Sequence, residues 1–159
     1  MNFNEIIQNV QQLDSPVIIG IEGASSSGKT TLGCNLSSYF DIEFVDLDSY
    51  VIRSDTPVPY TSQVNIEALK VKLAALVESN CTFIILGICL RDVLQMISIT
   101  ADIYIYVKKI ATNTIWHYGV EIETYDSENL VEPHKSDMKY HLAVKPHMNS
   151  TLVYERVAD

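Results

Sequence analysis

The stretch that decides the fold is IEGASSSGKTTLG, residues 21–33. Its Gly23, Gly28, Lys29 and Thr30 match the spacing G-x-x-x-x-G-K-[ST] in full. A short apolar run, VIIGIE at 17–22, precedes it, and a helical pattern follows it to about Phe40. A strand before this motif and a helix after it is the context in which such a loop binds phosphate. The alternative is a serine- and glycine-rich turn that merely caps a helix.

Glycines let the backbone of such a loop curl, so that successive N–H groups and the helix N-terminus point at phosphate oxygens. We expect Lys29 to reach the β and γ phosphates and the Thr30 hydroxyl to ligate Mg²⁺. The loop therefore predicts a ligand with several phosphates, together with Mg²⁺. The predicted cofactor-binding residues are Gly23, Ser25, Ser26, Ser27, Gly28, Lys29, Thr30 and Thr31.

Two aspartates, Asp46 and Asp48, end the second apolar stretch, IEFVDLD at 42–48. They point to the same side if the strand continues that far, because side chains alternate along a strand. A carboxylate beside a transferred phosphoryl group accepts the proton of an acceptor hydroxyl or holds Mg²⁺ through water. We predict Asp48 to be the catalytic base, together with Lys29 as the phosphate clamp, and Asp46 to be a metal residue beside Thr30. The alternative is that Asp48 only starts a turn.

A long polar segment with two prolines follows at 50–64. Loops of this length in a compact domain are usually functional or mobile. Tyr50 and Arg53 open it, and an aromatic face and a guanidinium suit a ring or a sugar oxygen. We predict both to contact the phosphoryl acceptor, although a solvated surface arginine is the alternative for Arg53.

The remaining pattern alternates strands with helices, which predicts an α/β fold: a mainly parallel five-stranded sheet between two helical layers. The chain shows no repeat or linker, so residues 1–159 are expected to form a single domain. The region 110–145 is polar and poorly periodic up to a helix near its end. The further expected strands are 82–90, 101–109 and 150–157, and the further expected helices are 3–13, 65–78, 91–98 and 136–144.

The composition limits the classes of molecule that the protein is expected to bind. With 20 acidic and 11 basic residues the net charge is −9, so the field of the chain repels nucleic acids and anionic membranes. The first residues lack the basic and apolar regions of a secretory signal, and no apolar run approaches the roughly 20 residues that cross a bilayer. We expect a cytoplasmic protein with a small-molecule acceptor and leave the oligomeric state open.

The cysteines and histidines carry no recognisable site pattern. Without CxxC spacing, the three cysteines are expected to be reduced, buried thiols. The histidines lack metal-ligand spacing and are expected on helix and loop surfaces, with His117 a weak candidate for the acceptor side. These residues are Cys34, Cys81, Cys89, His117, His134, His141 and His147.

Taken in order, GASSSGKTTL, VDLDSY, FIILGICL, ADIYIYV and YHLAVKPHMNSTLVYERV resemble the uridine kinase-like branch of the P-loop kinases. The resemblance implies a P-loop nucleoside triphosphate hydrolase fold. It also implies that ATP, or sometimes GTP, is the cofactor, and that its γ-phosphate is transferred to the hydroxyl of a nucleoside or another small molecule. The family's phosphate-loop residues correspond to Lys29 and Thr30, and its Asp-x-[FY] element, which carries the base, corresponds to Asp48 and Tyr50.

Two departures from the family pattern weaken the implied activity. Leu86 stands where the third strand of the family commonly carries an acidic residue that helps to place Mg²⁺. Lys108 and Lys109 stand where arginines of a lid are expected, and lysine lacks the planar fork of arginine. The leading hypothesis is an ATP-dependent small-molecule kinase. The second is a nucleotide-binding protein, a sensor or degenerate kinase, without phosphotransferase activity.

Overall fold

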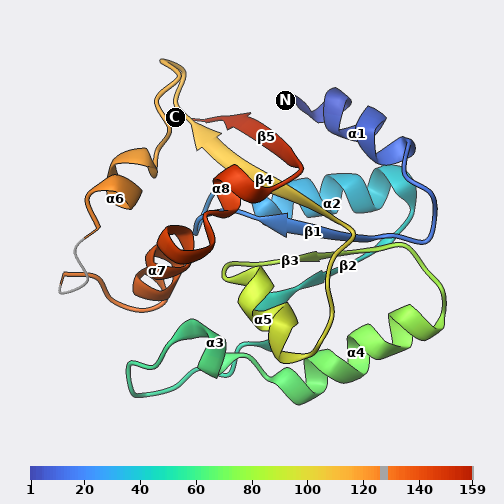
Figure 1. Cartoon of the computed structure of the whole chain (residues 1–159), viewed down its shortest axis with the longest axis horizontal. Helices are drawn as coiled ribbons and strands as arrows, with labels where there is room; N and C mark the ends of the chain where they lie inside the picture. Colours follow the sequence, from blue (N-terminus) through green and yellow to red (C-terminus); the bar gives the residue numbers. More distant parts are fainter. Residues whose placement is uncertain (126–128, 159) are drawn as a thin grey trace.

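The computed structural model describes residues 1–125 and 129–158 and is built on a five-stranded sheet in the order β2-β3-β1-β4-β5 (Figure 1). Every neighbouring pair of strands is parallel, which confirms the predicted α/β fold. All five carboxyl ends therefore meet at one edge of the sheet. The strands are β1 Ile18–Glu22, β2 Glu43–Asp46, β3 Phe83–Leu86, β4 Ile103–Ile110 and β5 Leu152–Val157.

Helices cover both faces of the sheet, as the alternating pattern predicts. They are α1 Phe3–Gln11, α2 Lys29–Phe40, α3 Tyr60–Gln63, α4 Ile66–Glu78, α5 Leu90–Met96, α6 Gly119–Glu123, α7 His134–Val144 and α8 Pro146–Asn149, with a 3₁₀ turn, η1, at Leu47–Tyr50. None of the helices in the described part of the chain combines the length and apolarity that a membrane span requires.

The alternation of side chains along β3 divides the core in two. Phe83 and Ile85 pack with α4 and α5, whereas Ile84 and Leu86 pack with α1 and α2. Because both faces of β3 are covered, the strand is apolar throughout, as is typical of a parallel sheet. The two packed layers fix the carboxyl edge of the sheet, where the polar loops emerge.

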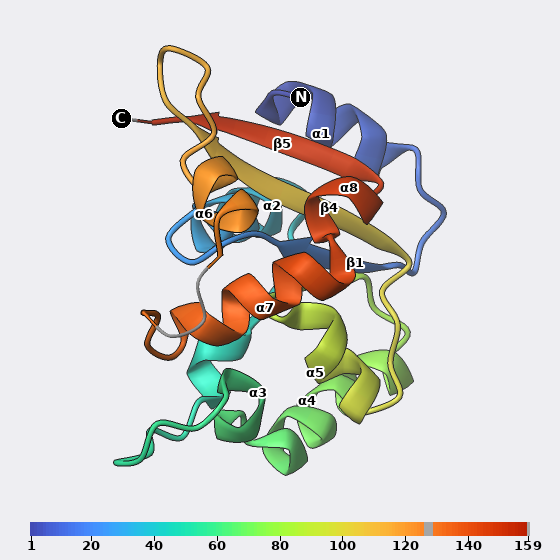
Figure 2. The same ribbon diagram turned by 60° about the vertical axis from the view of Figure 1, so that its left-hand side comes forward.

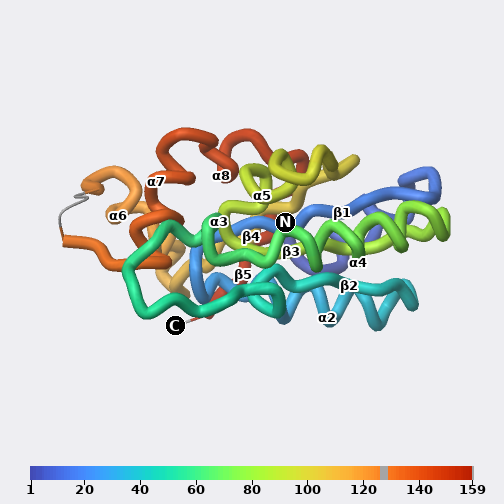
Figure 3. The backbone as a smooth tube through the Cα atoms, turned by 90° about the horizontal axis from the view of Figure 1, so that it is seen from below, coloured from blue at the N-terminus to red at the C-terminus, as the bar shows by residue number. Residues whose placement is uncertain are grey.

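Helices α6 and α7 and the segment that leads to α3 gather beside this edge (Figures 2 and 3). The long loop predicted at 50–64 begins at Tyr50, the last residue of η1, and contains α3 near its end. It is tied at its base by an antiparallel bridge between Val51 and Val64. Residues 126–128, part of the polar region predicted at 110–145, lie outside the described residues.

The expectation of three buried thiols was wrong for two of them. Cys34 and Cys81 are exposed, because one lies on the solvent side of α2 and the other in the turn between α4 and β3, whereas Cys89 is buried. The expectation of surface histidines was wrong for His141, which is 1% exposed. Its place on α7 faces the sheet, where the side chain contacts Tyr106.

Candidate functional site

The glycine-rich loop connects β1 directly to α2. Gly28 takes φ +109° and is the N-cap of α2, with no side chain bonded to the first turn. Only glycine adopts this backbone conformation readily. The first N–H groups of the 12-residue helix α2 are therefore left for an external acceptor, which makes this helix end a suitable anion site.

Lys29 opens α2 and folds back onto the loop. Its side chain is buried, and the ammonium Nζ donates to the carbonyl of Ala24 over 2.8 Å. Burial lowers the pKa of Lys29, while the carboxylates of Asp137, Asp48 and Asp46 act in the opposite direction. The ammonium group is thus held inside the loop by one carbonyl and a surrounding negative field.

Thr30 and the two predicted aspartates are brought together. The Thr30 hydroxyl donates to Oδ2 of Asp46 over 3.0 Å, and Oδ1 of Asp46 accepts the N–H of Asp48 over 2.9 Å. The condition under which Asp46 and Asp48 would share one side of a strand is not met, because β2 ends at Asp46 and the chain turns into η1. Asp46 caps that turn, and the turn carries Asp48 to the same pocket.

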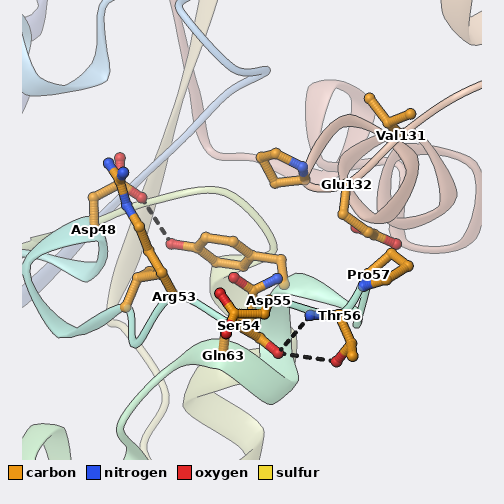
Figure 4. A pocket seen from close by; sticks show the side chains of 12 residues that line it. Asp48, Arg53, Ser54, Asp55, Thr56, Pro57, Gln63, Val131 and Glu132 are labelled. Carbon is orange, nitrogen blue, oxygen red and sulfur yellow. Dashed lines mark hydrogen bonds between the residues drawn. The ribbon is translucent and has the colours of Figure 1, made fainter.

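Asp48 is held by a residue that the sequence did not single out. The Tyr60 hydroxyl donates to Asp48 Oδ1 over 2.9 Å, a bond marked by the dashed line at Asp48 in Figure 4. Burial and the neighbouring carboxylate raise the pKa of Tyr60, so its hydroxyl stays a donor. The Tyr60 N–H donates in turn to Ser136 on α7, which joins the 50–64 loop to that helix.

Two adjoining cavities meet at Asp48. The first, here the phosphate pocket, has a volume of about 420 Å³ and is lined by the loop and the start of α2, with Asp46. The second, here the acceptor cavity, has about 710 Å³ and is lined by the 50–64 loop and residues 131–133 (Figure 4). Asp48, Tyr60 and Pro133 line both cavities.

Of the two residues predicted to contact an acceptor, only Arg53 lines the acceptor cavity, where its side chain is exposed. Tyr50 packs against the core beside α4 and lines neither cavity. His117 lines neither cavity as well, and its Nε2 contacts the carbonyl of Ala158. Tyr50 is absent from the acceptor cavity because η1 turns its ring toward the core.

Two further residues hold the phosphate loop. Both come from the polar, poorly periodic region 110–145. The carboxylate of Asp137 on α7 is fully buried, and its Oδ2 accepts the Ser25 N–H over 2.8 Å. The Tyr118 hydroxyl donates to the Ser25 carbonyl. In the sequence, the feature that relates to these contacts is the spacing of Asp137 and His141, four residues apart on a polar helix. The structure shows that both side chains are buried.

The structure also shows the surroundings of Leu86, Lys108 and Lys109, the residues that depart from the family pattern. Leu86 is buried beside the phosphate pocket and fills the space left open by Gly33, where a Cβ would lie 2.3 Å from Leu86 Cδ2. An apolar side chain there offers no metal ligand. Lys108 and Lys109 belong to β4 rather than to a lid, and Lys108 Nζ lies 5.0 Å from the centre of the Trp116 ring.

Comparison with family models finds no match, and comparison with curated protein sequences also finds none. Solved structures do match. A structure described as a possible uridine kinase from Bacillus stearothermophilus aligns over 96% of this chain and 96% of its own, with a TM-score of 0.63 and 17% identity. A sugar kinase from a Janibacter species aligns over 91% of this chain and 86% of its own, with a TM-score of 0.48 and 16% identity. The first match confirms, at the level of the fold, the resemblance to uridine kinase-like P-loop kinases.

Proposed function

We propose that this chain is a small-molecule kinase that transfers the γ-phosphate of ATP, or of GTP, to a hydroxyl group of a nucleoside or similar metabolite. One observation carries the proposal: Asp48 lines both the phosphate pocket and the acceptor cavity. A hydroxyl held at Asp48 in the acceptor cavity faces a nucleotide held by the loop. A residue shared by two cavities is what direct transfer between two ligands requires, because the reacting atoms must approach to about 3 Å.

The loop residues bind and orient the polyphosphate. The uncapped N–H groups at the start of α2 donate to phosphate oxygens, and Lys29 exchanges the Ala24 carbonyl for the β and γ phosphates. Positioning and charge stabilisation supply most of the catalysis in phosphoryl transfer. The burial of Lys29 strengthens its electrostatic effect, because the surroundings screen the ammonium group less than water does.

The oxygen atoms of Thr30 and Asp46 fit Mg²⁺, which prefers hard oxygen ligands and usually retains waters and substrate phosphates. Within residues 1–125 and 129–158, no group of three His, Cys, Asp or Glu side chains is arranged to hold a metal ion. Waters and the phosphates of the nucleotide would supply the remaining ligands. When bound, Mg²⁺ neutralises charge on the transferred phosphoryl group.

Asp48 acts as the general base. Tyr60 occupies its Oδ1, and Oδ2 has no hydrogen-bond partner among the residues that the structure describes. Oδ2 accepts the proton of the acceptor hydroxyl while the hydroxyl oxygen forms a bond to the γ-phosphorus. The bond from the γ-phosphorus to the β–γ bridging oxygen breaks, the nucleoside diphosphate leaves, and Asp48 releases its proton to solvent.

The charges of the acceptor cavity favour an uncharged or cationic acceptor. Asp48, Asp55 and Glu132 face one basic residue, Arg53, among the residues that line it. An acceptor that already carries a phosphate would meet three carboxylates, which disfavours its binding. We therefore expect nucleosides and neutral polyols to be better acceptors than nucleoside monophosphates.

The test is ADP release from MgATP across nucleosides, nucleoside monophosphates, sugars and other hydroxyl compounds. An acceptor in the favoured class is expected to raise turnover. Asp48→Asn should then lower the increase by roughly 10²- to 10⁴-fold, and Lys29→Ala should abolish nucleotide binding. Asp14→Asn, an exposed aspartate far from both cavities, is the control and should keep full turnover. No increase with any acceptor, or an increase that survives Asp48→Asn, contradicts the proposal.

One observation favours a second candidate, a nucleotide-binding protein without transferase activity. Leu86 is 1% exposed at the phosphate pocket, where a carboxylate would assist the metal ion. This candidate predicts that the wild type binds nucleotide, that Lys29→Ala does not, and that no acceptor changes the rate of ADP release. The same panel of acceptors separates the two candidates.

A further inference from the structure

Arg156, on the last strand, lies against the phosphate loop although the two are distant in the sequence. A Cβ added to Gly28 would lie 2.6 Å from Arg156 Cδ and 3.0 Å from its Nη1. Nη1 donates to the Ser27 carbonyl over 3.4 Å, and Arg156 lines the phosphate pocket with Lys29 and Thr30. The arginine stem therefore rests on the glycine that begins α2.

This guanidinium differs from the other two in the chain. Arg91 is paired with the buried Glu22 over 2.9 Å, and Arg53 is exposed in the acceptor cavity. Arg156 forms no ion pair with any carboxylate among the residues that the structure describes. What sets Arg156 apart from Arg53 is its contact with the phosphate loop, so its unpaired charge is available to a ligand of the phosphate pocket.

The position of Arg156 suits the binding of an anion beside it. The N-terminus of a helix carries a partial positive charge, and the guanidinium lies at the N-cap of α2. Lys29 adds a second cation to the same pocket. The carboxylates of Asp46, Asp48 and Asp137 lie around Lys29, so Arg156 and the helix N-terminus are the positive groups of this pocket that remain for a ligand with several negative charges.

We propose that Arg156 binds the phosphate groups of the nucleotide together with Lys29 and the N–H groups of α2. This inference rests on the proposed function, because it takes the nucleotide to occupy the phosphate pocket. Guanidinium is suited to the task, since its planar fork gives two parallel hydrogen bonds to a phosphate and it stays charged. Lysine at this position would supply only a point charge.

The experiment measures binding of ATP and of inorganic triphosphate, which has no base, by titration calorimetry. Arg156→Gln keeps a polar side chain and removes the charge, Arg156→Lys keeps the charge and removes the fork, and Lys70→Ala removes an exposed cation on α4 as the matched control. For Arg156→Gln we expect about a 10- to 100-fold loss of affinity for both ligands. A smaller loss is expected for Arg156→Lys, and none for the control.

Unchanged triphosphate affinity in both Arg156 variants overturns the inference, even when ATP binding weakens, because the contact would then be to the base. Thermal unfolding of each variant checks that the fold is kept, and Arg156→Lys serves if Arg156→Gln is unstable. Failure of Lys29→Ala to weaken triphosphate binding overturns this inference and the nucleotide site of the proposed function together. Weakened binding without acceptor-dependent turnover supports Arg156 and contradicts only the kinase proposal.

Discussion

Removal of the Asp137 carboxylate is expected to destabilise the protein through the phosphate loop. The carboxylate is fully buried and accepts the Ser25 N–H over 2.8 Å. A hydrogen bond to a charged group contributes about 1.5–3 kcal/mol, so Asp137→Ala should cost about 2 kcal/mol. In a chain of 159 residues this corresponds to a fall in Tm of about 4–8 °C.

The loss of stability in Asp137→Ala should depend on pH, because Asp137 influences the pKa of Lys29. Burial lowers the pKa of Lys29 below the ordinary 10.5, and Asp137 is the leading charge that opposes this shift. Between the lowered pKa and 10.5, the unfolded chain binds more protons at this lysine than the folded chain does. Stability from this group therefore rises with pH in that interval. The variant loses the opposing charge, so the pKa of its Lys29 falls further than in the wild type. Its deficit should therefore shrink as the pH rises from the variant's lowered pKa to that of the wild type, and stay constant above it.

Thermal unfolding followed by circular dichroism at several pH values measures both quantities. Lys139→Ala, an exposed change on the same helix, is the control for loss of helix contacts and should melt within about 1 °C of the wild type. An Asp137→Ala variant that also melts within about 1 °C of the wild type at neutral pH would refute the role given to the carboxylate. A deficit that grows with pH would refute the coupling to Lys29.

Two further predictions concern Tyr60 and the three cysteines. Tyr60→Phe removes the donor to Asp48 Oδ1 and should lower acceptor-dependent kcat about tenfold while nucleotide affinity stays unchanged; equal losses in kcat and nucleotide affinity, measured by steady-state kinetics and titration, would show that Tyr60 acts on the loop instead. Cys34 and Cys81 should react with a thiol reagent in the native protein, whereas Cys89, whose pKa is raised by burial, should react only after unfolding; labelling followed by mass spectrometry checks this, and rapid labelling of Cys89 would contradict its burial.

The parts of the site that the sequence predicted each carried a local signal. The glycines around Lys29 are spaced for a phosphate loop, and Asp46 and Asp48 follow an apolar strand. Each of these signals can be recognised within a short stretch of sequence. The structure brings the residues that carry them together at the carboxyl edge of the sheet. Whether the strand continues beyond Asp46 could not be decided from periodicity, because the Asp46 side chain caps the 3₁₀ turn by accepting the N–H of Asp48.

The residues that the sequence missed act over long separations. Asp137 and Tyr118 reach Ser25 from a polar region, and Arg156 reaches Gly28 from the last strand. Each contact depends on where the sheet places its strands and on how α7 packs, so no pattern within a short window could indicate it. Strand periodicity predicted β5 but not that its arginine would rest on the loop.

The most direct test of the central claim follows the γ-phosphate itself. ATP labelled at the γ-phosphate is incubated with the protein and with the acceptor that raises ADP release most, and the labelled products are separated. The account predicts that the label appears in the phosphorylated acceptor, and that Asp48→Asn suppresses this product while nucleotide binding is kept. Label found only in inorganic phosphate, or in an acceptor product that Asp48→Asn does not diminish, would contradict the claim that Asp48 joins the two cavities for direct transfer.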